Sequence, residues 1–168
     1  MDEPVGVAGG RSRGAVADLS RARDELERLG ERAYRSTCTA YLADALYAEG
    51  RVREAEQMAD AAEAESAAED SVNFAIVDGV RARIAADRGE VATAGRLAES
   101  SVGFAFRMDM PKPQADALSV RACVLLASGR RVEAAEVLDQ AIAMYEHKGE
   151  LAAARKAHSA FLAASAAG

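Results

Sequence analysis

The sequence has no tryptophan, three prolines and two cysteines, and aromatic residues make up 5% of it. Few strand-forming aromatics are therefore present, and few prolines interrupt a helix. Forty-one of the 168 residues are alanine, which loses no side-chain entropy on entering a helix. The composition predicts an all-α fold, and the length suits one domain or one extended array.

A basic surplus is also missing, because 27 acidic residues oppose 21 basic ones and give a net charge of -6. Nucleic-acid binding needs a basic face that neutralises phosphates, so direct binding to DNA or RNA is not expected. No apolar run of about 18 residues is present to span a bilayer. The first residues, "MDEPVGVAGGRSRG", start acidic and contain no apolar core, so they do not predict a signal peptide. We therefore expect a cytoplasmic protein without nucleic-acid or membrane partners.

Residues with the chemistry of an active or metal site are scarce. Cys38 and Cys123 lie far apart within helical patterns and are expected to stay reduced. His147 and His158 have no cysteine or second histidine at metal-ligand spacing, so no metal site is predicted. No lysine follows a glycine as a phosphate loop requires, and no nucleophile elbow is present. The sequence predicts no catalytic residue and no cofactor, and hence a protein that is not an enzyme.

A repeat is the strongest positive feature. The stretch "VRARIAADRG" (80–89) returns as "VRACVLLASG" (120–129). Three glycines 39 and 40 residues apart each have an alanine five positions later, in the pairs Gly50 and Ala55, Gly89 and Ala94, Gly129 and Ala134. Glycine permits the left-handed turn that closes a helix, and alanine lets the next helix pack closely. The period predicts stacked helical hairpins that turn at the three glycines.

The repeat fixes the expected boundaries. First helices are predicted over 31–49, 70–88 and 112–128, and second helices over 52–67, 91–108 and 131–147. Residues 18–33 also align with 137–152, so a half-repeat is expected at each end. The predicted organisation is a disordered lead (1–13), a half-repeat (14–30), repeats 31–69, 70–109 and 110–148, a half-repeat (149–164) and a tail (165–168).

Further expectations follow from the register. Alanines seven residues before each glycine should lie where the two helices of a hairpin approach: Ala43, Ala82 and Ala122. Arg81 and Arg121 fall off the apolar stripe and are expected to be solvated or to form salt bridges between repeats. Asp70 is predicted to cap the helix that follows it.

The small-x6-Gly-x4-Ala string in all three copies resembles tetratricopeptide repeats. The early Trp or Tyr of that family is missing, and the period is about 40 rather than 34, which suggests the longer helices of the MalT-type branch. The string "RAYRSTCTAYLADALYAEGRVREAEQMADAAE" (32–63) is similar to C-terminal helical segments of actinobacterial signalling ATPases, some fused to an adenylate or guanylate cyclase and others of the LuxR type. The resemblance implies a right-handed superhelical stack of antiparallel helix pairs with a regulatory, protein-binding role.

In tetratricopeptide arrays, one side of each first helix lines a concave groove. By register the lining residues would be Thr37, Ala40, Asp44, Tyr47, Ile76, Gly79, Arg83, Asp87, Asp116, Ser119, Cys123 and Leu126. The Lys, Asn and Arg of the family's carboxylate clamp are absent. The predicted partner-binding residues are Asp44, Tyr47, Arg83, Asp87, Asp116 and Leu126, with Tyr47 and Leu126 as apolar anchors. An ordinary solvated face, with an Arg83–Asp87 ion pair inside one helix, is the alternative.

Three functions remain open at this point. The first is a non-catalytic module that binds a protein or peptide within a signalling system. The second is a sensory domain that binds a small molecule or peptide, which a closed apolar pocket would favour over an open groove with charged rims. The third is a scaffold that self-associates through helix faces left unpaired at the two ends of the array.

Overall fold

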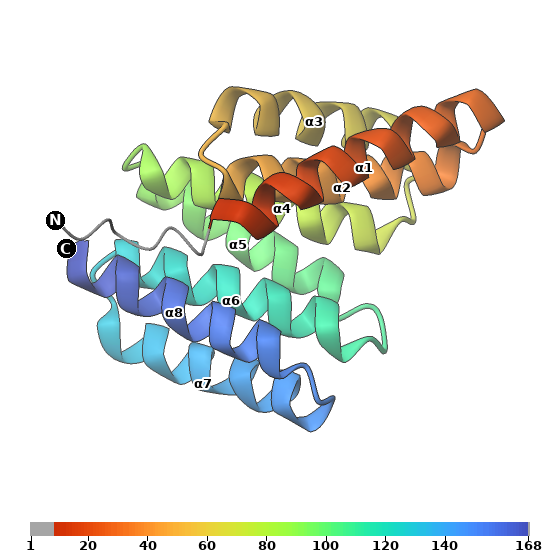
Figure 1. The fold of residues 1–168 in the computed structure, drawn as a ribbon. Helices are drawn as coiled ribbons and strands as arrows, with labels where there is room; N and C mark the ends of the chain where they lie inside the picture. The colour runs from red at the N-terminus through yellow and green to blue at the C-terminus, as the bar shows by residue number, and fades with distance from the viewer. Residues whose placement is uncertain (1–8, 168) are drawn as a thin grey trace, which may run out of the picture.

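The structure is a computed structural model that describes residues 9–167, and these residues form helices and short connections without a strand (Figure 1). The all-α class predicted from composition is therefore confirmed for the described part. The helices are α1 (Gly9–Leu29), α2 (Arg32–Ala48), α3 (Val52–Glu65), α4 (Ser71–Asp87), α5 (Val91–Ala105), α6 (Pro111–Ala127), α7 (Arg131–His147) and α8 (Leu151–Ala167).

The predicted hairpin turns are confirmed at Gly50, Gly89 and Gly129. Their φ angles are +75°, +74° and +76°, a region that other residues adopt only at a cost. At the first turn, Gly50 N–H donates to the Tyr47 carbonyl at 2.9 Å and Arg51 N–H donates to the Leu46 carbonyl at 3.0 Å. This paired bonding satisfies carbonyls that the ending helix leaves open. The same geometry recurs at Gly30 and Gly149, which end α1 and α7.

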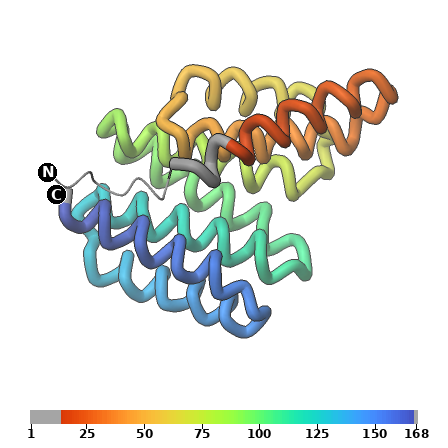
Figure 2. Tube along the Cα trace, viewed as in Figure 1, coloured from red at the N-terminus to blue at the C-terminus, as the bar shows by residue number. Residues whose placement is uncertain are grey.

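The helices form two layers, and the chain reverses direction at each connection (Figure 2). The inner layer consists of α2, α4, α6 and α8, each in contact with the next. The outer layer consists of α1, α3, α5 and α7, and each of these helices contacts its sequence neighbours in the inner layer. One repeat thus contributes one inner and one outer helix, so equivalent positions of successive repeats line up along each layer.

The core confirms the predicted packing alanines. Ala55, Ala94 and Ala134 are 0%, 1% and 0% exposed. Their counterparts on the inner helices, Ala43, Ala82 and Ala122, are all fully buried. Small side chains at these positions allow the two helices of a hairpin to approach closely, and the larger apolar side chains fill the space between hairpins.

The polar expectations of the repeat also hold. Arg81 on α4 lies 2.7 Å from Asp60 and from Glu63 on α3, and Arg121 on α6 lies 2.8 Å from Glu99 on α5. Both arginines therefore link their own repeat to the preceding one. Cys38 and Cys123 are free thiols, as predicted. Asp70 caps α4 by accepting a hydrogen bond from the backbone N–H of Asn73 at 3.1 Å.

Helix ends differ from the predicted boundaries by a few residues. α1 already begins at Gly9, ahead of the expected boundary at residue 14, and α8 continues to Ala167, past the expected boundary at 164. α5 ends at Ala105 rather than at 108, and the third inner helix starts one residue early because Pro111 suits a first helical turn. The remainder of the predicted lead, residues 1–8, and residue 168 lie outside the described residues. No helix of the described part combines the length and apolarity needed to cross a bilayer.

Candidate partner-binding site

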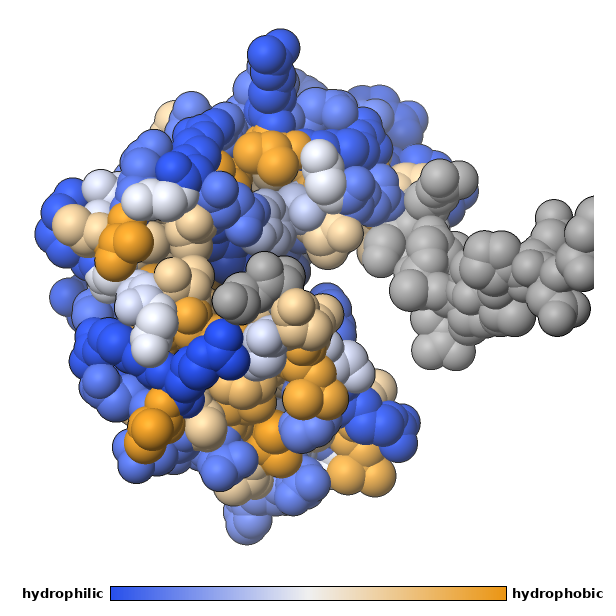
Figure 3. All heavy atoms as spheres, turned by 90° about the vertical axis from the view of Figure 1, so that its left-hand side faces the viewer, coloured by the Kyte–Doolittle hydropathy of each residue, from blue (hydrophilic) through white to orange (hydrophobic). Residues whose placement is uncertain are grey.

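The two layers bend around a hollow, which Figure 3 shows between the part that carries α1–α3 and the part that carries α6–α8. Side chains of α2, α4 and α6 form what we call the inner face. Its half-exposed polar and aromatic members are Tyr41, Asp44, Tyr47, Arg83, Asp87, Lys112, Asp116 and Ser119. Five of the six predicted partner-binding residues belong to this face.

Four of the predicted residues contact one another directly. The Arg83 guanidinium lies over the Tyr47 ring, 4.5 Å from its centroid, and pairs with the Asp44 carboxylate. The Tyr47 hydroxyl donates to Asp87 at 2.9 Å. The side chains of Arg83 and Asp44 are 21% and 38% exposed, so the group is fixed but remains open to a partner.

The alternative of an ion pair between Arg83 and Asp87 is wrong, because Arg83 pairs with Asp44 of the neighbouring helix instead. Asp44 and Arg83 stand six residues before Gly50 and Gly89, and they therefore occupy equivalent positions of adjacent inner helices. The Arg83 Nε donates to the Gly79 carbonyl at 3.2 Å, which turns the guanidinium towards α2. The pair consequently joins two repeats rather than two turns of one helix.

The environment shifts the proton affinity of this group. Burial alone would raise the pKa of Asp44, but the charge and the hydrogen bond of Arg83 outweigh it and hold the pKa below its usual value. Burial, together with the hydrogen bond to Asp87, raises the pKa of Tyr47. At neutral pH the face thus presents an ionised carboxylate, a guanidinium and a neutral phenol.

A second polar group lies on the α6 side of the inner face. The Tyr145 hydroxyl of α7 donates to Asp116, and Lys112 Nζ donates to the other oxygen of the same carboxylate at 2.8 Å. Burial raises the pKa of Cys123, and the charge of Arg83 opposes this shift. Asp116 is thus held as predicted on the inner face, but it is already bonded to residues of its own chain.

One predicted anchor is not available. Leu126 is 9% exposed and belongs to a core cluster with Leu138 and Tyr145. Ala40 and Gly79, two of the expected lining positions, are buried as well, because the inner helices pack closely against each other there. Leu126 therefore lies in the core and cannot act as the apolar anchor predicted for the third repeat.

Three residues that contribute to the face were not predicted from the sequence. Tyr41 is 39% exposed and lies one helical turn before Asp44, a spacing that could have revealed it. Lys112 lies one helical turn before Asp116, so the spacing could have revealed it as well. Tyr145 comes from an outer helix and reaches the inner face through the layer, which no periodicity within one helix indicates.

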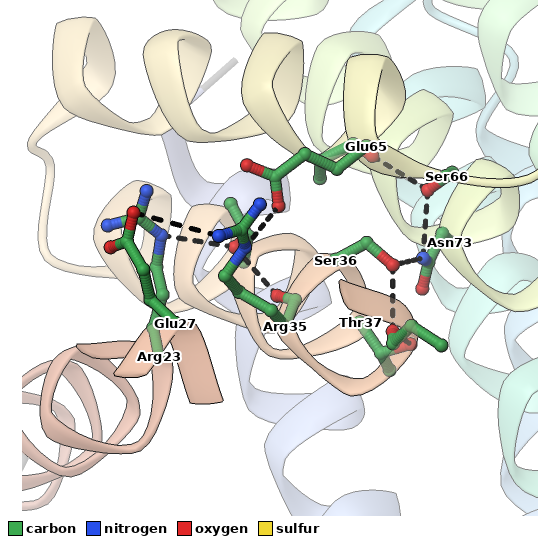
Figure 4. Close-up of polar contacts among 11 residues, drawn as sticks. Arg23, Glu27, Arg35, Ser36, Thr37, Glu65, Ser66 and Asn73 are labelled. Atoms are coloured by element: carbon green, nitrogen blue, oxygen red, sulfur yellow. Dashed lines mark hydrogen bonds and ion pairs between the residues drawn. The ribbon is translucent and has the colours of Figure 1, made fainter. Parts of the chain in front are cut away.

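A separate polar cluster joins the first four helices (Figure 4). The Asn73 amide nitrogen donates to Ser36 Oγ at 2.9 Å and to Ser66 Oγ at 2.8 Å, and Asn73 is fully buried. Beside it, Arg35 Nε donates to Glu65 at 3.0 Å. The Asn73 amide nitrogen is bonded in the gap between two repeats, whereas its Oδ1 is buried there without a hydrogen-bond partner. We assign the cluster a role in holding the repeats together.

Two hollows on the outer layer are open to solvent, with volumes of about 440 and 600 Å³. Charged side chains surround both of them. Among residues 9–167, no three His, Cys, Asp or Glu side chains lie close enough together to hold a metal ion.

Comparisons of the chain with models of protein families, with curated proteins and with solved structures found no match. The resemblance to tetratricopeptide regulators is therefore a proposal that depends on the repeat itself.

Proposed function

We propose that this protein is a non-catalytic helical-repeat module of tetratricopeptide type that binds a protein or peptide through its inner face. The observation on which the proposal depends is the half-exposed group of Asp44, Tyr47, Arg83 and Asp87, in which each side chain is held by another. Tyr and Arg are the residues most enriched at binding hot spots. The resemblance to regulators of the cyclase-fused and LuxR types extends the proposal to a bacterial signalling system.

Pre-organisation supports this choice of surface. Binding costs free energy when side chains lose rotamer freedom, by about 0.5–1.5 kcal/mol for each long side chain that becomes fixed. The contacts of Arg83 with Asp44 and Tyr47 already fix its guanidinium in the free protein. When a partner stacks on Tyr41 or bonds to Asp44, the side chains of this surface would therefore lose little conformational entropy.

A partner protein fits better than a small-molecule ligand. The outer hollows are open and have charged rims, and a small-molecule site is normally a largely enclosed apolar cavity. The sensory function is thus the weaker alternative.

Self-association is the second candidate, and a specific feature of α8 favours it. Leu162 is 55% exposed and stands at the position that Ala43, Ala82 and Ala122 occupy in the other inner helices. At the three alanine positions the outer helix of the same hairpin packs against the inner helix, whereas α8 contacts no such helix within the described residues. Sedimentation of the protein and of Leu162→Lys would test this candidate, since only a self-associating chain would lose mass on substitution.

Site-specific photo-crosslinking tests the main proposal. Tyr41 is replaced by p-benzoyl-phenylalanine in the native cell, and Phe106, an exposed aromatic residue at the end of α5, is replaced in a control strain. We expect a discrete crosslinked partner from position 41 that is absent from position 106. The same product from both positions, or none from position 41, would exclude the inner face as the binding surface.

A further inference from the structure

The two outer hollows are the same site in successive repeats. The second-repeat hollow is lined by Glu56, Asp60, Arg81, Ile84, Ala85, Arg88, Glu90, Thr93 and Leu97. The third-repeat hollow is lined by Val91, Gly95, Arg96, Ala98, Glu99, Arg121, Val124, Leu125, Ser128 and Arg130. Arg81, Ile84 and Ala85 correspond to Arg121, Val124 and Leu125 one period later, so the repeated stretch forms the floor of each hollow.

The second-repeat hollow has an ion pair that has no counterpart in the third. Arg88 of the α4 C-cap lies 2.7 Å from Glu56 of α3. One repeat later, Ser128 replaces the arginine and Gly95 replaces the glutamate. A Cβ added at Gly95 would meet no atom within 4 Å. The absence of both long side chains leaves the third-repeat hollow larger, about 600 Å³ against 440 Å³.

The residues that line the two hollows give them net charges of opposite sign. The second-repeat hollow has two arginines and three acids, whereas the third-repeat hollow has three arginines and one acid, in a protein of net charge -6. Glu99 pairs with Arg121 at 2.8 Å, and Arg130 pairs with Glu133 outside the lining. Arg96 donates only to the Thr93 hydroxyl, at 3.4 Å, among the described residues. Beside these arginines, Val91 is half exposed at the opening.

We propose that the third-repeat hollow is a second docking surface, on the outer layer, that binds an acidic peptide segment of a partner protein. Aliphatic side chains of the segment would lie on Val91 and on the floor of Val124 and Leu125. Its carboxylates would accept hydrogen bonds from Arg96, which has no carboxylate partner among the described residues, because guanidinium groups bind carboxylates in a directed, bidentate manner. This surface is independent of the inner face, since its residues belong to the opposite side of α6 and to the outer helices.

The second-repeat hollow provides a matched control within the same chain. The probe is a fluorescein-labelled synthetic peptide with leucines at i and i+4 spacing among glutamates, and its counterpart has lysines in place of the glutamates. Fluorescence anisotropy is measured against the full-length protein up to about 1 mM, the weakest affinity that we would regard as specific. We expect the acidic peptide to bind and the lysine peptide not to bind.

Moving the ion pair of Glu56 and Arg88 to the equivalent positions of the third-repeat hollow tests where the peptide binds. Gly95→Glu with Ser128→Arg installs the ion pair in the third-repeat hollow and should weaken binding at least about tenfold. Glu56→Gly with Arg88→Ser opens the second-repeat hollow without making it basic, and should leave the affinity unchanged. Arg96→Glu, a single change at an exposed position, should also weaken binding about tenfold, because it removes a charge-assisted hydrogen bond.

Several results would overturn the proposal. The first is that the acidic peptide does not bind, and the second is that the lysine peptide binds equally well. The third is that Gly95→Glu with Ser128→Arg leaves the affinity unchanged while its circular dichroism matches that of the wild type. Competition by inorganic phosphate at concentrations similar to those of the peptide would show a general anion site and would overturn the assignment to a peptide.

Discussion

At the scale of single residues, the size of the side chain at the contact between paired helices determines how closely they pack. Ala94 is almost completely buried, and its counterparts in the other repeats are also alanine. Ala94→Leu should lower the free energy of unfolding by about 1–3 kcal/mol, because the larger side chain forces α4 and α5 apart. Ala92→Leu, on the exposed side of the same helix, is the control and should change it by less than about 0.5 kcal/mol. Thermal denaturation of both variants would measure the difference, and equal melting temperatures would contradict the packing register.

Asp44 makes stability depend on pH in a predictable direction. Its pKa is lowered in the folded protein, mainly because Arg83 outweighs the effect of burial. A lowered pKa contributes stability above the unfolded value, near pH 4, and this contribution is lost as the pH falls through the folded value. Asp44→Asn should therefore lower the free energy of unfolding by about 1 kcal/mol at pH 7 and reduce its fall between pH 5 and 2.

The control for this experiment is the solvent-exposed pair of Asp18 and Arg21 on α1. Asp18→Asn should change stability by less than about 0.5 kcal/mol at either pH, because solvent screens the interaction. Denaturant titrations of both variants across the pH range would give the comparison. A wild-type acid dependence in Asp44→Asn would mean that the pair with Arg83 contributes no stability.

At the scale of helices and turns, glycine has opposite effects in two places. Gly89 has a φ of +74° in the turn between α4 and α5, whereas Gly103 lies inside α5, and a Cβ at either position would meet no atom within 4 Å. Gly89→Ala should destabilise the protein by about 1–2 kcal/mol through the backbone conformation alone. Gly103→Ala should stabilise it by about 0.5–1 kcal/mol, because alanine favours the helix. Chemical denaturation would measure both variants, and destabilisation by Gly103→Ala would contradict the helix assignment there.

The turns were predictable from the sequence for the same reason. Only glycine adopts a positive φ easily, so Gly50, Gly89 and Gly129 could be located without any knowledge of distant contacts. The partner of Arg83 could not be found in this way, because Asp87 on its own helix and Asp44 on the next are both within reach of a flexible side chain. The choice depends on the distance between repeats, which the sequence does not contain. Leu126 was misplaced for a related reason, since its burial depends on α7 packing over it.

At the scale of the whole molecule, the repeats share a backbone plan but differ in surface charge. The repeated stretch gives both outer hollows the same floor, and substitutions at a few rim positions change their charge and size. Stability in such an array comes from contacts between neighbouring repeats, whereas recognition comes from the residues that vary between them. The regular spacing therefore predicted the helices and turns well, but it did not predict side-chain contacts such as that of Arg83 with Asp44.

The same nearest-neighbour principle predicts how the molecule opens. Within residues 9–167, α4 contacts α2, α3, α5 and α6, whereas α8 contacts α6 and α7 and α1 contacts α2 alone. Local opening of a repeat array needs less free energy where a helix has fewer neighbours. Amide hydrogen exchange should thus be slowest in α4 and α6, faster in α8 and fastest in α1. Ala94→Leu should accelerate exchange in α4 and α5 while leaving α8 unchanged, because the two regions share no direct contact. Uniform exchange along all eight helices would mean that the array opens in a single cooperative step, and additive contributions from neighbouring repeats could then not describe its stability.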